Sequence, residues 1–223
     1  ELMDMMVQAG FDSVFIGIES PDETSLKECC KAHNQNRDLL QDVKSIHRSG
    51  LQVMGGFIVG FDNDKPSIFQ RQIEFIQKSG IVTAMVGMLQ APPGTRLFQR
   101  LQGERRIVDS FSGDNVDGTT NIIPQMGIDR LVQGYQAIMK TIYAPKNYYQ
   151  RVKTLLTELK APDFSQPLDT QRILSIFRSA LRLGVLGKER MHYWQLMLWT
   201  LLRKPRMISL AVTLAIFGYH YRK

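Results

Sequence analysis

Cysteine is almost missing from this sequence. The chain of 223 residues has two cysteines, and they are adjacent, Cys29 and Cys30. Neighbouring cysteines are poorly placed to bond to each other, and two cannot form a disulfide framework, which excludes a disulfide-stapled secreted scaffold. The first residues also lack the basic and apolar regions of a secretory signal, so a cytoplasmic location is expected.

Recognisable catalytic and metal-binding patterns are absent as well. The four histidines show no metal-ligand spacing, and no nucleophile elbow or Ser-His-Asp arrangement occurs. From these patterns we predict no catalytic residue and no metal ligand within the chain.

No apolar run is long enough to cross a bilayer comfortably. The longest candidate has 15 residues between Arg206 and Arg222. As a helix it would be about 22 Å long, against a hydrocarbon core of roughly 30 Å. Two interpretations stay open: the segment packs against its own domain, or it lies at a membrane surface with Arg and Lys directed toward anionic lipid.

Acidic residues become rare in the second part of the chain. Residues 1–142 hold 14 Lys/Arg and 17 Asp/Glu, a net charge of −3, whereas residues 143–223 hold 14 and 4, a net charge of +10. The basic residues are scattered along amphipathic segments without a zinc-finger or RNP-like pattern. Nucleic-acid binding is therefore not favoured.

The first part alternates apolar strands with amphipathic helices. Strands are predicted near 13–18, 52–59 and 81–89, and helices over 38–50 and 65–80. This alternation is typical of a parallel sheet covered by helices, in which ligands bind beyond the carboxyl ends of the strands. After about residue 127 the pattern is helical throughout.

The segment GGFIVGFDND, residues 55–64, has glycines within a strand and acids where it stops. Glycine weakens a strand, so Gly56 and Gly60 indicate either close approach of a flat ligand to the backbone, or a bulge and relief of crowding. Asp62 and Asp64 precede a predicted helix, and capping is the simpler role for Asp64.

Four segments of the first part carry a family resemblance: VFIGIES, SLKECCKAHNQN, GGFIVGFDND and LQAPPGTRLFQRL, in this order. Together they resemble the second half of the catalytic barrel of radical S-adenosylmethionine (radical-SAM) enzymes that carry a cobalamin-binding domain ahead of the barrel. The helical part, ending AVTLAIFGYHYRK, is similar to the uncharacterised domain after the barrel in one branch, which includes proteins similar to hopanoid ring methylases.

The resemblance implies an α/β fold followed by an all-α part. A partial (β/α) TIM-like barrel would cover residues 1–107, a connecting segment 108–127, and a helical C-terminal domain 128–223.

Five residues would contribute to binding SAM if the resemblance holds. Glu19, from the GIES motif, would accept the ribose hydroxyls, and Lys31 would meet the SAM carboxylate as a point charge. Gly56, Ile58 and Gly60, from a G-x-I-x-G strand, would lie against the adenine. Many relatives have an acid where Gly56 stands, so one ribose contact has no candidate here. Glu19 could instead be a buried acid paired with a neighbouring Lys or Arg, and Lys31 a solvated helix lysine.

The segment MLQAPPGT is similar to the barrel-mouth loop that borders substrate or cofactor in this family. Its polar members are Gln90 and Thr95. A turn set by proline and glycine is the simpler explanation of the same segment.

The largest departure from the family is the missing cluster loop. Its [4Fe–4S] cluster needs three thiolates in a C-x3-C-x2-C loop, which this chain lacks. We expect this loop, the first half of the barrel and the cobalamin-binding domain to lie upstream of Glu1, and the chain alone to be inactive.

The parent enzyme would use SAM, the cluster and cobalamin to methylate an unactivated carbon of a small-molecule or lipid substrate. In it, this chain would supply half of the SAM site and part of the substrate wall. The alternative is a non-catalytic helical binding or membrane-association module on a barrel scaffold.

Overall fold

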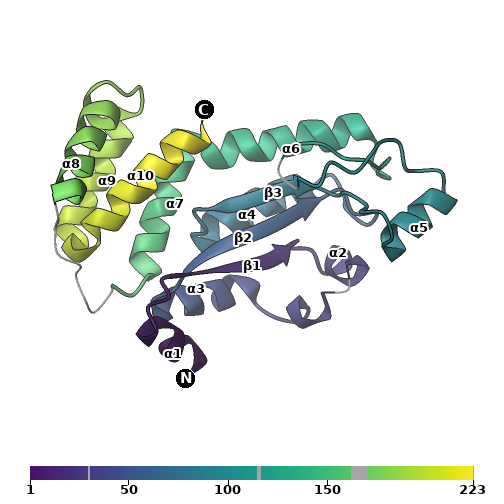
Figure 1. Cartoon of the computed structure of the whole chain (residues 1–223), viewed down its shortest axis with the longest axis horizontal. Coiled ribbons are helices and arrows are strands. Elements are labelled where there is room, and N and C mark those ends of the chain that lie inside the picture. The colour runs from purple at the N-terminus through teal and green to yellow at the C-terminus, as the bar shows by residue number, and fades with distance from the viewer. Residues whose placement is uncertain (30, 115–116, 162–169, 223) are drawn as a thin grey trace.

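A computed structural model describes residues 1–29, 31–114, 117–161 and 170–222. A small parallel sheet carries helices on one face and leads into a group of helices at the C-terminal end of the chain (Figure 1). The predicted order of an α/β part followed by a helical part is confirmed.

Three parallel strands form the sheet. They are β1 (Ser13–Glu19), β2 (Gln52–Val59) and β3 (Ala84–Met88), in the order β1-β2-β3. The third strand starts later than predicted, because the chain bends after the end of the preceding helix. Ile81 and Val82 are fully buried in this bend, so their apolar character reflects core packing and not strand pairing. The described strands form an open sheet and do not close a barrel.

Helices cover one face of the sheet and leave the other open. The covering helices are α3 (Leu39–Ser49) and α4 (Ile68–Ser79). Phe57 of β2 points to this side and is 2 % exposed. On the opposite face Phe15 and Met85 are 56 % and 43 % exposed, unusually high for large apolar side chains on a sheet.

Local signals account for the helix boundaries of this part. The Asp38 side chain accepts the Gln41 backbone N–H at 3.1 Å at the start of α3, and Gly50 ends this helix in a left-handed conformation. The remaining helices before residue 107 are α1 (Leu2–Gln8), α2 (Glu23–Glu28), the short 3₁₀ helix η1 (Ala32–Asn34) and α5 (Arg96–Gly103).

The helical part begins with two long helices separated at Ala144. Its elements are α6 (Ile128–Tyr143), α7 (Pro145–Glu158), α8 (Thr170–Ser179), the π-helix η2 (Ala180–Val185), α9 (Arg190–Arg203), the 3₁₀ helix η3 (Pro205–Met207) and α10 (Ile208–Tyr221). One continuous buried cluster extends from Val53 of β2 to Leu214 of α10, so the sheet and these helices share a core.

Arg151 of α7 lies fully buried at the centre of this junction. It donates to the carbonyl oxygen of Ile142 at 2.7 Å, to that of Val82 at 3.4 Å, and to the Gln77 side chain. Its guanidinium lies 5.4 Å from the ring centroid of Tyr148. Burial lowers the pKa of Arg151 to about 10, so the side chain is still a cation at neutral pH.

Two glycines allow helices of this core to approach closely. A Cβ atom at Gly134 of α6 would lie 2.2 Å from the Phe69 ring of α4, and one at Gly218 of α10 would lie 2.2 Å from the Tyr148 ring of α7. Tyr148 also donates a hydrogen bond to the Leu214 carbonyl oxygen at 2.7 Å. The apolar helix α10 therefore packs against its own domain.

In the described parts of the chain, no helix combines the length and apolar character needed to cross a membrane.

Candidate functional site

A cavity of about 630 Å³ lies beyond the carboxyl ends of the strands. This volume falls within the usual range for small-molecule sites, roughly 300–1,000 Å³. The lining side chains come from β1 and the segment after it, from the end of β2, and from the region after β3: Glu19, Glu28, Cys29, Lys31, Ile58, Phe61, Leu89, Thr95, Arg96, Leu97 and Arg100. This is the end of the sheet where the strand-helix pattern predicts a ligand.

The structure brings four of the predicted site residues to this cavity and places three elsewhere. Those that line it are Glu19, Lys31, Ile58 and Thr95, and those outside its lining are Gly56, Gly60 and Gln90.

Glu19 and Lys31 form an ion pair in the cavity, with Nζ 3.1 Å from Oε1. Both side chains stay partly exposed, Lys31 to 31 % and Glu19 to 16 %. Glu19 has a φ of 66°, a conformation that non-glycine residues seldom adopt and that often occurs at functional sites. Its backbone carbonyl accepts from the side chain of the buried Gln72 at 3.3 Å. The contact fits the paired-acid interpretation of Glu19, and the ligand role stays a prediction.

Gly17 is a site residue that the sequence did not reveal. A Cβ atom there would lie 2.5 Å from Glu19 Oε1 and 3.1 Å from Lys31 Nζ, so only glycine leaves room for the pair as it stands. Asn34 of η1 supports this strand end, since its side chain donates to the Gly17 carbonyl oxygen at 3.3 Å. The glycine of the VFIGIES motif was the available signal.

Side chains of the protein itself lie close to Gly56 and Gly60, where the sequence predicted the close approach of a ligand to the backbone. A Cβ atom at Gly56 would lie 3.0 Å from the Phe15 ring of β1. Gly60 has a φ of 109°, its N–H donates to Asp64 at 2.8 Å, and a Cβ atom there would lie 3.0 Å from Leu131. The adenine contact of this segment stays a prediction, with Ile58 the member that lines the cavity.

Gln90 and Thr95 each hold a loop in place. Gln90 is buried and donates to the Asp114 carbonyl oxygen at 2.8 Å. Thr95 accepts the Phe98 backbone N–H at 3.2 Å, which caps α5, and its hydroxyl donates to the Pro92 carbonyl oxygen at 2.7 Å. The Thr95 cap positions the first turn of α5 over the cavity.

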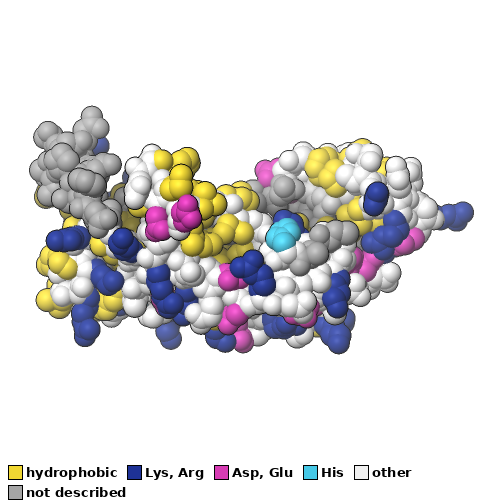
Figure 2. Space-filling model, turned by 90° about the horizontal axis from the view of Figure 1, so that it is seen from below, with side chains coloured by type: hydrophobic (Ala, Val, Ile, Leu, Met, Phe, Trp, Pro, Cys, Tyr) yellow, Lys and Arg dark blue, Asp and Glu magenta, His cyan; other side chains and the backbone are white. Residues whose placement is uncertain are grey.

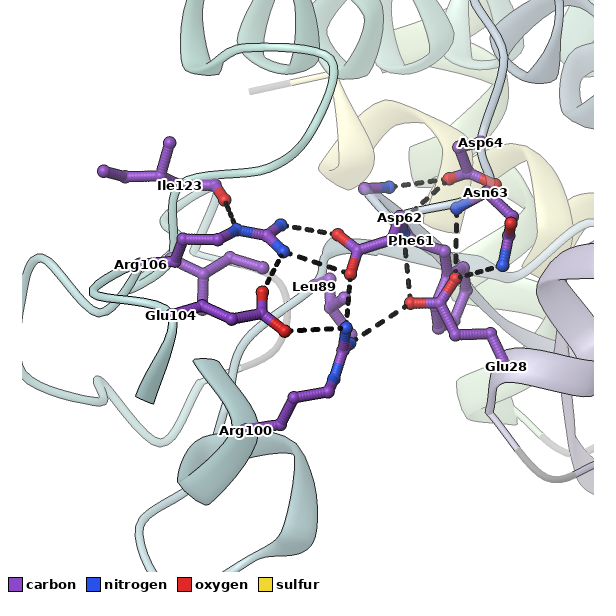
Figure 3. Close-up of polar contacts among 12 residues, drawn as sticks. Glu28, Phe61, Asp62, Asn63, Asp64, Leu89, Arg100, Glu104, Arg106 and Ile123 are labelled. Atoms are coloured by element: carbon purple, nitrogen blue, oxygen red, sulfur yellow. Dashed lines mark hydrogen bonds and ion pairs between the residues drawn. The ribbon is translucent and has the colours of Figure 1, made fainter. Parts of the chain in front are cut away.

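Asp62 joins the turn after β2 to α5 and the segment that follows (Figure 3). Its carboxylate accepts from Arg100 at 2.7 Å and from Arg106 at 3.1 Å. Glu28 of α2 accepts the backbone N–H groups of Asp62 and Asn63 at 3.0 and 3.1 Å. Burial alone would raise the pKa of Asp62, but the hydrogen bonds and charges of the two arginines hold it below its ordinary value.

The predicted helix cap at Asp64 is wrong. Helix α4 starts at Ile68 and has no side-chain cap, whereas Asp64 accepts the backbone N–H groups of Gly60 and Phe61 at 2.8 and 3.1 Å. It also accepts the Ser25 hydroxyl at 2.6 Å. Burial raises the pKa of Asp64 despite these bonds. The acids after β2 thus hold the turn that carries Phe61, a residue of the cavity lining.

Replacing Asp62 with asparagine is expected to lower the free energy of unfolding by about 1–2 kcal/mol at pH 7, since two charged partners lose their acceptor. Folding lowers the pKa of the Asp62 carboxyl below its ordinary value of 3.8. The carboxylate therefore stabilises the folded state at pH values above 3.8, and this stabilisation is lost as the pH falls through the pKa of Asp62 in the folded protein. Urea unfolding between pH 7 and pH 3 tests this. Asp129→Asn, at an exposed position, is the control, and a pH-independent loss at Asp62 would contradict the expectation.

Cys29 lines the cavity as a half-buried thiol, and burial raises its pKa, so it stays protonated at neutral pH. Cys30 lies outside the described residues. Throughout the described ranges, no group of three or more His, Cys, Asp or Glu side chains is placed to hold a metal ion.

Residues 95–223 match a protein family described as a domain of unknown function, DUF4070. The match covers more than half of the chain. The chain belongs to the DUF4070 family. The match starts at Thr95, the N-cap of α5, so the family domain includes one side of the cavity as well as the helical part.

Relatives that extend over the whole chain are named methyltransferases. The chain is 33 % identical over 226 residues to an uncharacterised methyltransferase of Synechocystis, covering 99 % of this chain and 42 % of the relative. It is 32 % identical over 212 residues to the hopanoid C-2 methylase of Rhodopseudomonas palustris, covering 91 % of this chain and 39 % of that enzyme.

A third relative is the bacteriochlorophyllide d C-12(1)-methyltransferase of Chlorobaculum tepidum, 24 % identical over 155 residues, or 69 % of this chain and 33 % of the relative. The chain spans 42 % and 39 % of the length of the first two relatives.

Proposed function

We propose that this DUF4070 chain is part of a radical-SAM methyltransferase, and that its cavity holds part of SAM. One observation carries the proposal: Glu19, Lys31 and Ile58, which come from three separate motifs, line one cavity beyond the carboxyl ends of the strands. The similarity to enzymes named methyltransferases supports the reaction class.

The chemistry of the cavity fits the parts of SAM. Glu19 offers acceptors for the ribose hydroxyls, and Lys31 offers a cation for the amino-acid carboxylate. Ile58, Phe61 and Leu89 provide apolar surface for a flat ring. When bound, SAM would supply the methyl or radical chemistry of this enzyme class.

The Glu19–Lys31 pair holds both side chains at the cavity before the ligand arrives. A partly exposed ion pair contributes only about 0–1 kcal/mol, so exchanging each partner for a ligand group costs little. Gly17 beneath the pair and the Gln72 hydrogen bond to the Glu19 carbonyl fix the backbone from which the carboxylate projects.

The rest of the site would come from another part of the protein. Two adjacent cysteines cannot supply the three thiolates of a [4Fe–4S] cluster, so the residues of this chain do not fit that group by themselves. Strand β1 pairs with β2 alone among the described strands, and its exposed Phe15 belongs to the open face. An upstream half-barrel added to β1 would cover this face, and a cobalamin-binding domain would precede it.

The substrate would then meet SAM at the mouth formed by α5 and the loop after β3. We propose a small-molecule or lipid substrate methylated at an unactivated carbon. The relatives act, by their names, on a hopanoid in one case and on a bacteriochlorophyllide in another.

Calorimetry of SAM binding tests this function. The protein is produced with its upstream sequence through a three-cysteine loop and reconstituted anaerobically with iron and sulfide. We expect SAM binding, and about a tenfold weaker affinity for Glu19→Gln, equal to about 1.4 kcal/mol. Glu74→Gln, on the exposed side of α4, is the control. A reconstituted cluster without SAM binding, or full affinity in Glu19→Gln, would refute the proposed site.

A further inference from the structure

Helix α9 is apolar on its outward side as well as toward the core. Its inward side chains Tyr193 and Leu196 are buried. Its outward side carries Met191, Trp194, Leu198, Leu201 and Leu202, with Leu202 80 % exposed. The spacing of these five residues places them on one side of the helix. A helix that is apolar all round is normally covered on every side, so this outward side lacks an expected partner surface.

The apolar surface continues onto the neighbouring helices. The Trp194 indole donates to the Gly184 carbonyl oxygen of η2 at 2.9 Å, which places the outward side of α9 beside η2. From α8, η2 and the residue that follows η2, the surface receives Phe177, Leu181, Val185 and Leu186, of which Phe177 is 68 % exposed and Leu186 75 % exposed. We call these nine side chains the α9 face.

Basic residues surround the α9 face. Residues 170–222 hold nine Lys/Arg and one acid, Glu189. This acid is buried in an ion pair with Arg222, so it does not offset the surrounding charge. Arg178 of α8, Lys188 in the turn between η2 and α9, and Arg190 of α9 are exposed. Figure 2 shows apolar side chains among Lys and Arg at the end of the molecule that holds these helices.

We propose that the α9 face docks on the surface of a bilayer containing anionic phospholipid. Leu, Phe and Trp side chains bordered by Lys and Arg are the composition of helices that lie in the headgroup region, with the apolar side in the acyl boundary and the cations against lipid phosphate. No span is required, and none is present in the described chain.

Charge favours this occupant over a second copy of the chain. A two-fold symmetric dimer through the α9 face would bring two basic borders together with no acidic residue opposite, and like charges across an interface oppose association. An anionic bilayer neutralises the same border.

The face and the cavity lie at opposite ends of the molecule (Figure 1). Helix α5, which borders the cavity, is at one end, and α8 and α9 are at the other. We therefore assign the α9 face to anchoring the protein and not to delivering a substrate into the cavity. This assignment does not depend on the proposed SAM site.

Vesicle sedimentation of the full chain tests the proposal. Vesicles of phosphatidylcholine with one third phosphatidylglycerol are compared with phosphatidylcholine alone. We expect binding to the anionic vesicles that is weakened by salt, and at least tenfold weaker binding by the double variant Leu198→Gln, Leu202→Gln. The pair Leu2→Gln, Val108→Gln changes two other exposed apolar residues, 72 % and 51 % exposed and outside the face, and should bind as the unmodified chain does. Circular dichroism confirms that each variant is folded.

A second variant separates the charge from the apolar contribution. Arg178→Gln with Lys188→Gln should reduce the preference for anionic vesicles at least threefold while circular dichroism is unchanged. Absence of vesicle binding by the folded chain, or full binding by the leucine double variant, would overturn the proposal. So would a dimer in light scattering that persists with vesicles present and that the leucine double variant dissociates, because a second copy would then cover the face.

Discussion

Replacing Arg151 with alanine is expected to lower the free energy of unfolding by about 3–5 kcal/mol. The side chain is fully buried, and its loss leaves the carbonyl oxygens of Ile142 and Val82 and the Gln77 side chain without their donor. It also leaves a void between the sheet and the helical part, next to the Tyr148 ring. Urea unfolding followed by circular dichroism measures the change.

Two further variants separate the causes of this loss. Methionine in Arg151→Met fills much of the same volume but has no hydrogen-bond donor. This variant should therefore keep most of the packing energy and lose about 1–3 kcal/mol, because the buried acceptors have no donor. Arg151→Lys keeps a cation but not the planar set of donors, and should stay well below the unmodified protein. Lys146→Ala, at an exposed position of the same helix, should change little. A loss under 1 kcal/mol for Arg151→Ala would show that the junction does not depend on this cation.

Replacing Gly17 with alanine is expected to weaken SAM binding about a hundredfold, or about 2.7 kcal/mol, in the reconstituted protein. The new methyl group would lie 2.5 Å from Glu19 Oε1, so the carboxylate must move, and 3.1 Å from Lys31 Nζ, so the ammonium group must give by a few tenths of an ångström and the pair is disturbed. This loss exceeds that expected for Glu19→Gln because two proposed ligand contacts change together. Calorimetry gives the affinity.

Gly103→Ala is the matched control, since a Cβ atom there meets no atom within 4 Å and the residue lies in α5 near the cavity. Unchanged SAM affinity in a folded Gly17→Ala protein would show that the Glu19–Lys31 pair does not bind the ligand. A structure of this variant without SAM, with the pair displaced, would confirm the steric argument even if the proposed function failed.

Sequence patterns predicted the secondary structure well where the signals are local. The helix predicted over 38–50 is α3, and the residues that bound it, Asp38 and Gly50, are adjacent to it in the chain. The start of β3 was less predictable, because Ile81 and Val82 are apolar for a reason that lies in the folded core. Asp64 was misassigned for a similar reason: its partners include Ser25, which is distant in sequence.

The sequence predicted which residues belong to the site better than it predicted the contacts between them. Motifs selected Glu19, Lys31, Ile58 and Thr95, and the structure places all four around one cavity. They did not reveal that Glu19 and Lys31 contact each other, or that Gly17 makes room for them. Gln90 was selected for its polarity, but its amide holds the loop at Asp114, a partner that no spacing rule indicates.

The sequence by itself determined the order of strands and helices, the basic character of the second part and the lack of a three-cysteine loop, because periodicity, composition and residue counts need no partner. Only the tertiary structure decided which apolar helix is covered. Both α9 and α10 are apolar, yet α10 buries Ala211, Leu214 and Ala215 while α9 leaves Leu198 and Leu202 exposed. Burial depends on which surfaces meet, and Gly218 lets α10 approach the Tyr148 ring, a contact between helices far apart in the chain.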